Sequence, residues 1–396
     1  MINVLKGKHI LIIVENLPVP FDTRVWQEAC ALKEYGARVT IICPRNDWYL
    51  KKKEKINGIY IYRHPQPHEA KRLMGYILEY SNALFWEFIL SLKVFLKCRF
   101  HVIHGCNPPD LIFLIGLFYK IFGVKYIFDH HDLVPELFES KYNDNVIALR
   151  LAKTFERLTF MTANLSIATN NSYKEIAIGR DKMLSDKVFV VRSGPSIERL
   201  KVTSGNIKFK KGKKYLIGYL GVIGEQEGLE ILLKIVEIIL LKTNDVHFAI
   251  VGDGPKLNSI KKLSRGMGLT NCIDFYGRIP DEELIDIINT ADICVNTDKS
   301  SSMNNLSTMN KIMEYMALKK PIIQFKCKEG HFTAQKASLY IEHNDIYDFA
   351  DKILWLLNHD SERKEMGEFG YSRVMKNLLW DYQKVNLIKA YESIFK

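Results

Sequence analysis

Short signature motifs are scarce in this sequence of 396 residues. It contains no P-loop, no HExxH, no GxSxG and no GxGxxG, and the nearest approach to the last, Gly218-x-x-Gly221-x-x-Gly224, has the wrong spacing. No Asp-x-Asp triplet occurs, which argues against a metal ion held by paired carboxylates. The sequence therefore offers no ready signature for a phosphate loop, dinucleotide binding, zinc-dependent hydrolysis or a serine nucleophile.

Cysteine pairs and long apolar runs are missing as well. The seven cysteines form no CxxC pair and mostly lie in apolar runs, so we expect small buried side chains in a reducing compartment. Cys98, His101, His104 and Cys106 crowd together, but their spacing fits no usual zinc site, and a strand would turn the two histidines to opposite faces. Residues 111–128 are interrupted by two lysines, and the N-terminal apolar run is short, so we expect neither a membrane span nor a signal peptide.

Acidic residues are outnumbered, because 56 Lys and Arg face 45 Asp and Glu, a net charge of +11. Residues 1–200 hold 28 basic and 20 acidic residues, which is +8, and the remainder holds 28 and 25, which is +3. The densest basic run is Lys51, Lys52, Lys53 and Lys55, followed by Lys71 and Arg72. This excess favours an anionic partner, and the absence of a basic–aromatic recognition motif argues against nucleic acid.

Strand and helix patterns alternate twice along the chain. The predicted strands are 9–14, 38–43, 59–63, 101–104, 125–128, 165–168 and 188–191 in the first half, and 215–220, 247–251, 273–276, 292–296 and 321–325 in the second. This alternation predicts an α/β fold with two doubly wound, Rossmann-like domains that face each other across a cleft, and a helical C-terminus. The predicted divisions are an N-terminal domain at 1–200, a polar linker at 201–214, a second domain at 215–372 and a C-terminal helix at 373–396 that packs back toward the first domain.

One helix carries the most informative pattern, at residues 307–318. Met309, Ile312, Met313, Met316 and Ala317 recur at helical spacing and predict a buried stripe. The polar face of the same helix carries Ser307, Asn310, Lys311 and Glu314. With Ser307 or Thr308 as N-cap, the helix N-terminus and Lys311 would suit a pyrophosphate, and Glu314 would suit a ribose. The alternative is a solvated face with a Lys311–Glu314 ion pair.

Six stretches of the sequence are informative together: residues 219–224 (YLGVIG), 248–255 (FAIVGDGP), 273–280 (IDFYGRIP), 291–295 (ADICV), 311–317 (KIMEYMA) and 128–136 (FDHHDLVPE). They resemble family 4 retaining glycosyltransferases, which have the GT-B fold. The resemblance implies nucleotide-sugar binding by the second domain and acceptor binding by the first. In such enzymes the departing phosphate takes the acceptor proton, so the resemblance implies no cofactor, no metal and no protein nucleophile.

The resemblance also implies individual roles. Its catalytic residues are His131 at the donor sugar, Lys311 at the diphosphate and Glu314 at the ribose. Its donor-binding residues are Gly221, Arg192, Gly277, Arg278, Ile279, Ser307, Thr308 and Asn310. Its acceptor-side residues are Asp22, Arg24 and Asp132, although Arg24 could equally pair with Glu28, and Asp132 could cap a loop.

Three family positions depart from the usual pattern. The family commonly has two glutamates eight residues apart on this helix, and this chain has Leu306 at the position of the first. It has Val222 and Glu227 where the family usually has an arginine and a lysine in the phosphate loop. Similar departures occur in a subgroup that assembles bacterial surface polysaccharide or exopolysaccharide. Lys311, the helix N-terminus and Arg192 would have to compensate for the two missing cations.

The resulting expectation is a cytoplasmic enzyme that moves a hexosyl or N-acetylhexosaminyl group from a nucleotide-diphosphate sugar, such as a UDP-sugar. Its acceptor would be a glycan or a polyprenyl-diphosphate-linked sugar. The basic run beside an aromatic helix pattern at 74–96 predicts peripheral attachment to an anionic membrane surface, against the alternative of a core helix beside a solvated loop. Two other functions stay open: a sugar-nucleotide 2-epimerase of the same fold, and an inactive membrane- or glycan-binding scaffold.

Overall fold

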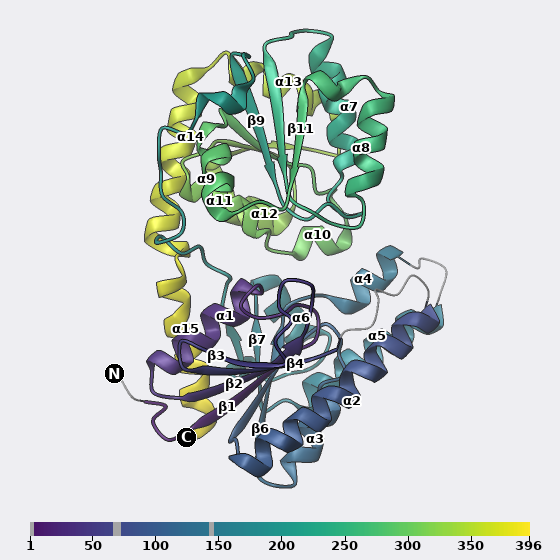
Figure 1. Ribbon diagram of the computed structural model, residues 1–396, viewed down its shortest axis with the longest axis vertical. Helices are drawn as coiled ribbons and strands as arrows, with labels where there is room; N and C mark the ends of the chain where they lie inside the picture. Colours follow the sequence, from purple (N-terminus) through teal and green to yellow (C-terminus); the bar gives the residue numbers. More distant parts are fainter. Residues whose placement is uncertain (1–3, 66–72, 142–145) are drawn as a thin grey trace. The chain divides into compact units, whose positions relative to one another are not determined.

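The computed structural model describes residues 4–65, 73–141 and 146–396, and the chain divides into two compact units (Figure 1). The first unit comprises Met1–Ser193 and Asp381–Lys396, and the second comprises Gly194–Trp380. The sequence predicted the first division at residue 200 and a linker at 201–214, whereas residues 194–214 belong to the second unit. Lys71 and Arg72 lie outside the described residues.

Within the described residues, the first unit is built on an eight-stranded sheet in the order β3-β4-β2-β1-β5-β6-β7-β8. All neighbouring strands are parallel except β3 and β4, which form an antiparallel pair at one edge. The strands are β1 (His9–Val14), β2 (Arg38–Pro44), β3 (Lys53–Ile56), β4 (Ile59–His64), β5 (Val102–Cys106), β6 (Lys125–His130), β7 (Leu165–Ala168) and β8 (Val188–Val190). The central strands are buried along their whole length because helices cover both faces of a parallel sheet.

Seven α-helices accompany this sheet in the described part of the first unit. They are α1 (Thr23–Glu34), α2 (Leu73–Lys97), α3 (Phe113–Lys120), α4 (Val134–Lys141), α5 (Val146–Thr162), α6 (Asn171–Gly179) and the C-terminal α15 (Trp380–Phe395). No described helix combines the length and the apolar character needed to cross a membrane.

The second unit has a six-stranded parallel sheet in the order β11-β10-β9-β12-β13-β14, counted over its described residues. Its strands are β9 (Tyr215–Leu220), β10 (Val246–Val251), β11 (Ile273–Gly277), β12 (Ile293–Asn296), β13 (Ile322–Phe325) and β14 (Ser338–Ile341). Its helices are α7 (Leu229–Leu240), α8 (Leu257–Gly266), α9 (Asp281–Thr290), α10 (Ser302–Leu306), α11 (Asn310–Ala317), α12 (Lys328–Ala334), α13 (Ile346–Leu357) and α14 (Asp360–Arg373). Two apolar clusters, one containing residues of α7 and α13 and the other residues of α9 and α11, form its core.

The start of the most informative helix differs from the prediction. Neither Ser307 nor Thr308 caps it, because α11 begins at Asn310 with Met309 at the N-cap. Ser307 has extended backbone and donates its hydroxyl to the carbonyl of Met303 at 2.9 Å. The capping serine is Ser301, whose side chain accepts from the N–H of Asn304 and starts the preceding short helix α10. The predicted stripe is confirmed, since Ile312, Met313, Met316 and Ala317 are buried and Met309 packs against them.

Candidate functional site

In the second unit, the loop after β9 approaches the first turn of α11. Gly221 has φ +153°, and a Cβ built on it would lie 3.1 Å from Cε and 3.2 Å from Nζ of Lys311. A larger residue there would crowd the lysine. Since β9 belongs to a parallel sheet, this loop lies at the carboxyl edge of the strands, where such sheets bind ligands. The structure therefore brings together two of the predicted residues, Gly221 and Lys311.

Lys311 is engaged by an acid that the sequence analysis missed. Its Nζ lies 2.8 Å from Oδ1 and 3.0 Å from Oδ2 of Asp298, which follows β12. The same ammonium lies 3.4 Å from the hydroxyl of Tyr219 on β9. The side chains of Asp298 and Lys311 are 3% and 10% exposed, so this is a buried ion pair. Burial raises the pKa of Asp298 above its usual range, although Lys311 opposes that shift.

A second acid belongs to the same neighbourhood. Glu227 ends the loop that begins at Gly221, and its Oε2 accepts the N–H of Gly224 at 3.1 Å. Burial and the nearby Asp298 raise the pKa of Glu227, while Lys311 lowers it. The Thr297 hydroxyl donates to the Glu227 carbonyl at 2.9 Å and so ties the two acidic loops together. At the position where the family usually has a lysine, this chain therefore has the carboxyl group of Glu227, close to Lys311.

Glu314 also has a partner, but it is not Lys311. Nη1 of Arg199 lies 2.6 Å from Oε1 of Glu314, and Arg199 forms two further bonds to Asp281 at 2.8 and 3.0 Å. The alternative prediction of a Lys311–Glu314 ion pair is therefore wrong, because each side chain pairs outside its own helix. Arg199 lies just before the polar stretch 201–214, where no pattern marked it as a partner.

The other predicted donor residues lie on separate segments. Gly277 ends β11 with φ +65°, Arg278 is exposed, and Ile279 packs against the second unit's core. Asn310 is the first residue of α11 and is exposed. Arg192 belongs to the first unit, where its backbone N–H donates to Gln383 of α15 at 3.2 Å.

In the first unit, a buried cluster of charges surrounds Arg24. Its Nη2 lies 2.9 Å from Asp129 and 3.0 Å from Glu28, and its Nη1 donates to the carbonyl of Val191 at 2.8 Å. The predicted alternative, an Arg24–Glu28 pair, is thus confirmed. Burial raises the pKa of Glu28 well above its usual range. Burial acts the same way on Asp129, but Arg24, His131 and His104 outweigh it and hold the pKa of Asp129 well below its usual range.

His131 joins this cluster through its inner ring nitrogen. Nε2 lies 2.6 Å from Oδ2 of Asp129 and 3.0 Å from Nε of Arg24, so it can serve only one of them at a time. Because Asp129 is held ionised, the consistent assignment places a proton on Nε2 and leaves Nδ1 for a ligand. The backbone N–H of His131 donates to Oδ1 of Asn107 at 2.7 Å, which fixes the loop after β6.

His104 extends the cluster to the C-terminal helix. Its Nε2 lies 3.1 Å from Asp129 and its Nδ1 lies 2.7 Å from the hydroxyl of Tyr391 on α15. Burial lowers the pKa of His104, so a neutral ring donates to Asp129 and accepts from Tyr391. The chain thus connects its last helix to His131 through Asp129.

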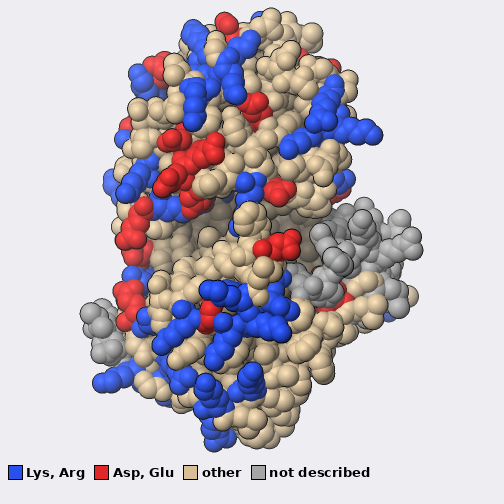
Figure 2. Space-filling view, viewed as in Figure 1, with Lys and Arg blue, Asp and Glu red and all other residues tan. Residues whose placement is uncertain are grey.

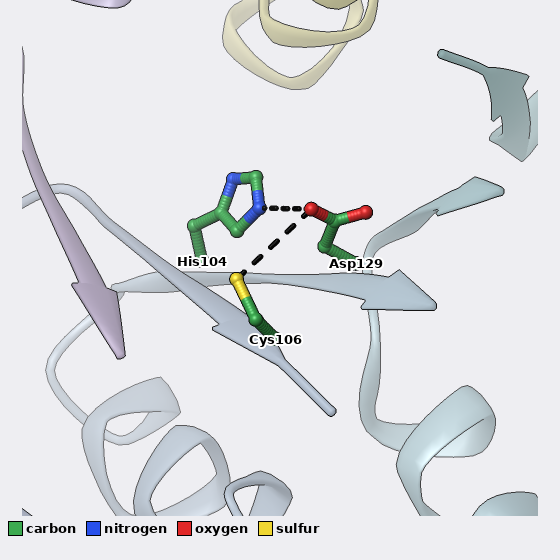
Figure 3. Close-up of side chains that lie close together, drawn as sticks. All are labelled: His104, Cys106 and Asp129. Atoms are coloured by element: carbon green, nitrogen blue, oxygen red, sulfur yellow. Dashed lines mark hydrogen bonds and ion pairs between the residues drawn. The ribbon is translucent and has the colours of Figure 1, made fainter. Parts of the chain in front are cut away.

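Figure 3 shows His104, Cys106 and Asp129, whose ligand atoms lie within 4.8 Å of one another. Glu28, Asp129 and His131 form a second group of this kind. In both groups the Arg24 guanidinium already balances the charge of Asp129, with Nη2 lying 2.9 Å from Oδ1. Of the four residues considered as zinc ligands, His104 and Cys106 belong to these groups and the other two do not. His101 accepts the N–H of His9, and the sulfur of Cys98 accepts from Arg38.

The two remaining acceptor-side residues have structural partners. The Asp22 carboxylate accepts the N–H of Val25 at 3.0 Å and caps α1. The backbone of Asp132 bonds with both ends of the Asn107 amide, at 2.8 and 3.1 Å. The sequence analysis missed Asp129, Asp298 and Arg199. Asp129 and Asp298 each come just after a predicted strand. A polar residue at the carboxyl end of a parallel strand was therefore the signal that could have found them.

Two family models match the chain in succession. Residues 22–199 match "Glycosyltransferase Family 4" and residues 214–359 match "Glycosyl transferases group 1". The poly(ribitol-phosphate) alpha-N-acetylglucosaminyltransferase of Staphylococcus aureus is 24% identical over 209 residues, which is 50% of this chain and 40% of that protein. The chain covers between 40% and 61% of the length of this relative and of similar ones from yeast and Methanocaldococcus jannaschii.

Solved structures match over nearly the whole chain. Sucrose-phosphate synthase from Thermosynechococcus elongatus superposes with a TM-score of 0.80 at 16% identity, covering 98% of this chain and 99% of that one. Anabaena Alr3699/HepE, solved in complex with UDP and glucose, gives a TM-score of 0.74 at 13% identity over 97% and 99% of the two chains. At such identities these likenesses establish the fold.

Proposed function

From the premise that this chain belongs to the family 4 glycosyltransferases, with a GT-B fold, we propose that it transfers a sugar from a nucleotide-diphosphate donor to a glycan or lipid-linked acceptor. The observation that carries this proposal is the approach of the Gly221 backbone to Lys311 at the carboxyl edge of the second sheet. A glycine loop whose backbone comes close to an ammonium group suits a diphosphate.

The chemistry follows from where charge develops. Breaking a glycosyl–phosphate bond leaves negative charge on the diphosphate and positive charge on the sugar. Lys311 and the N–H groups at the start of α11 would stabilise the leaving group. Glu314 would accept hydrogen bonds from the ribose hydroxyls after Arg199 moves away from it. Nδ1 or the outer ring face of His131 would contact the sugar. The leaving phosphate would take the acceptor proton, so no protein nucleophile or metal is needed.

UDP-sugars are the donor class to test first. Anabaena HepE was solved with UDP and glucose, and the S. aureus relative is named for transfer of N-acetylglucosamine. We propose a hexosyl or N-acetylhexosaminyl donor of this type, used in cell-surface polysaccharide assembly. A polyprenyl-diphosphate-linked acceptor on an anionic membrane would account for the basic first unit, where Lys and Arg gather in Figure 2.

A panel of nucleotides and nucleotide sugars, read by thermal shift and then by product analysis, tests the proposal. We expect stabilisation by UDP or GDP, and slow hydrolysis or transfer with one matching sugar nucleotide. Isomerisation of the nucleotide sugar would favour a 2-epimerase instead. The absence of any nucleotide binding would favour an inactive scaffold and contradict the proposal.

A further inference from the structure

The ammonium group of Lys311 has no spare hydrogen-bond donor. A lysine ammonium has three N–H donors. Two point at the oxygens of Asp298, at 2.8 and 3.0 Å, and the third reaches the Tyr219 hydroxyl at 3.4 Å. An incoming phosphate can therefore bind Lys311 only by taking the place of a present partner. Asp298 offers the same chemistry as a phosphate, namely two adjacent anionic oxygens.

The surroundings of Asp298 are poor in positive charge. Among the described residues, Lys311 on α11 is the cation that acts on Asp298, and Lys299, its sequence neighbour, is exposed. The other titratable groups that interact with it are Glu227 before α7, Tyr219 on β9, Tyr315 on α11 and Cys327 before α12. With both carboxyl groups ionised, Lys311, Asp298 and Glu227 sum to one net negative charge, which would repel a diphosphate.

We propose that Asp298 is a built-in placeholder for the donor diphosphate: it holds Lys311 in position in the free protein and takes up a proton when the nucleotide displaces it. This inference rests on the proposed function and names the residue that sets how the donor is admitted. Asp298 is a positioning residue, because it acts through Lys311. Glu227, in the same neighbourhood, can share the proton.

The direction of the pH effect follows from like charges. An arriving phosphate raises the pKa of Asp298 and of Glu227 further, beyond the rise that burial already causes in the free protein. Binding then takes up protons, so affinity falls as the pH rises. The terminal phosphate of UDP has a pKa of about 6 and is ionised above pH 7.5, so it contributes little to this trend.

Isothermal titration calorimetry of the full chain with UDP, at pH 7.5 and 8.5 in buffers of different ionisation enthalpy, counts these protons. We expect measurable proton uptake and about threefold or greater weakening between the two pH values in the wild type. Asp298→Asn should reduce the uptake and bind UDP more tightly than the wild type at pH 8.5. Asp351→Asn, which removes the exposed partner of Lys242 in the same unit, serves as the matched control and should leave proton uptake unchanged.

The outcomes are distinguishable. UDP binding without proton uptake in the wild type overturns the placeholder role alone and leaves the proposed function standing. Weaker binding by Asp298→Asn at both pH values, with uptake unchanged, also overturns it, because Asp298 would then only orient Lys311. If neither UDP nor GDP binds the wild type at any pH, the donor site itself is contradicted and the inference falls with it. The wild-type measurement decides the question even if the variant does not fold.

Discussion

At the residue scale, Lys311 and Glu314 on α11 are each paired with a side chain that the sugar nucleotide must displace. Lys311→Ala and Glu314→Ala should each lower transfer by about ten- to a hundredfold, because a charge-assisted hydrogen bond contributes ~1.5–3 kcal/mol. Lys319→Ala removes a partly buried lysine that pairs with Glu368 and is the matched control. Steady-state transfer rates check this. Rates within twofold of wild type for both variants would contradict the site assignment.

A second residue-scale prediction concerns Glu87, a fully buried carboxyl group on α2. Burial raises its pKa from 4.5 to about 8. The unfolded chain ionises above pH 4.5 while the folded protein stays protonated, so this group lowers stability progressively between pH 4.5 and 8. At pH 5 the melting temperatures of Glu87→Gln and the wild type should therefore be similar. At pH 8 the variant should melt a few degrees above the wild type.

Differential scanning calorimetry at the two pH values gives this comparison. Glu136→Gln is the control for loss of a carboxylate in the same unit, because Glu136 is a partly exposed partner of Arg180. An equal melting difference between Glu87→Gln and wild type at both pH values would show that Glu87 does not titrate in this range.

At the element scale, two surfaces of the first unit bear on membrane attachment. The edge strand β3 and the segment before it carry the exposed Lys51, Lys52, Lys53 and Lys55. The outer face of α5 mixes the exposed cations Arg150, Lys153 and Arg157 with Ile147 and Met161, which are 74% and 68% exposed. Basic residues beside exposed apolar side chains are typical of interfacial binding, at about 1 kcal/mol per cation.

Co-sedimentation with anionic vesicles should therefore show binding that weakens at high salt. Changing the four lysines at 51, 52, 53 and 55 to Gln should reduce it, and changing the three α5 cations to Gln gives a separate comparison of the two surfaces. Protein that stays in the supernatant with anionic vesicles at low salt would exclude membrane attachment and favour a soluble acceptor.

The sequence predicted most elements because local patterns and burial agree there. The runs at 9–14, 165–168 and 215–220 are strands with the predicted bounds. Two edge strands were missed: the lysine-rich β3, whose composition resembles a solvated loop, and the short β14. The cap of α11 was misplaced because Ser307 is a good cap by type, whereas in the structure it ends the short helix α10, which Ser301 caps, and α11 begins only at Asn310.

The site was predictable only where one helix supplied both residues. Lys311 and Glu314 share a face of α11, so spacing alone put them together. Their partners Asp298 and Arg199 are 13 and 115 residues away, respectively, and no periodicity links such positions. The same holds for Tyr391, which meets His104 across 287 residues.

At the scale of the whole molecule, two parallel-sheet units carry separate groups of charged residues. The Arg24–Asp129–His131 group lies in the first and the Lys311–Asp298 group in the second. Because Lys311 and backbone N–H groups can neutralise a leaving diphosphate, we expect turnover to be unchanged in excess EDTA. Loss of activity that Mg²⁺ or Mn²⁺ restores would show that the donor site works through a metal.

The most direct test of glycosyl transfer is proton NMR of the products formed from a panel of UDP- and GDP-sugars. The account predicts that one donor releases its nucleoside diphosphate, that the sugar or glycoside first formed keeps the donor's anomeric configuration, and that Lys311→Ala slows this release by about ten- to a hundredfold. A nucleotide sugar that is isomerised but never cleaved, or cleavage at the wild-type rate in Lys311→Ala, would contradict it.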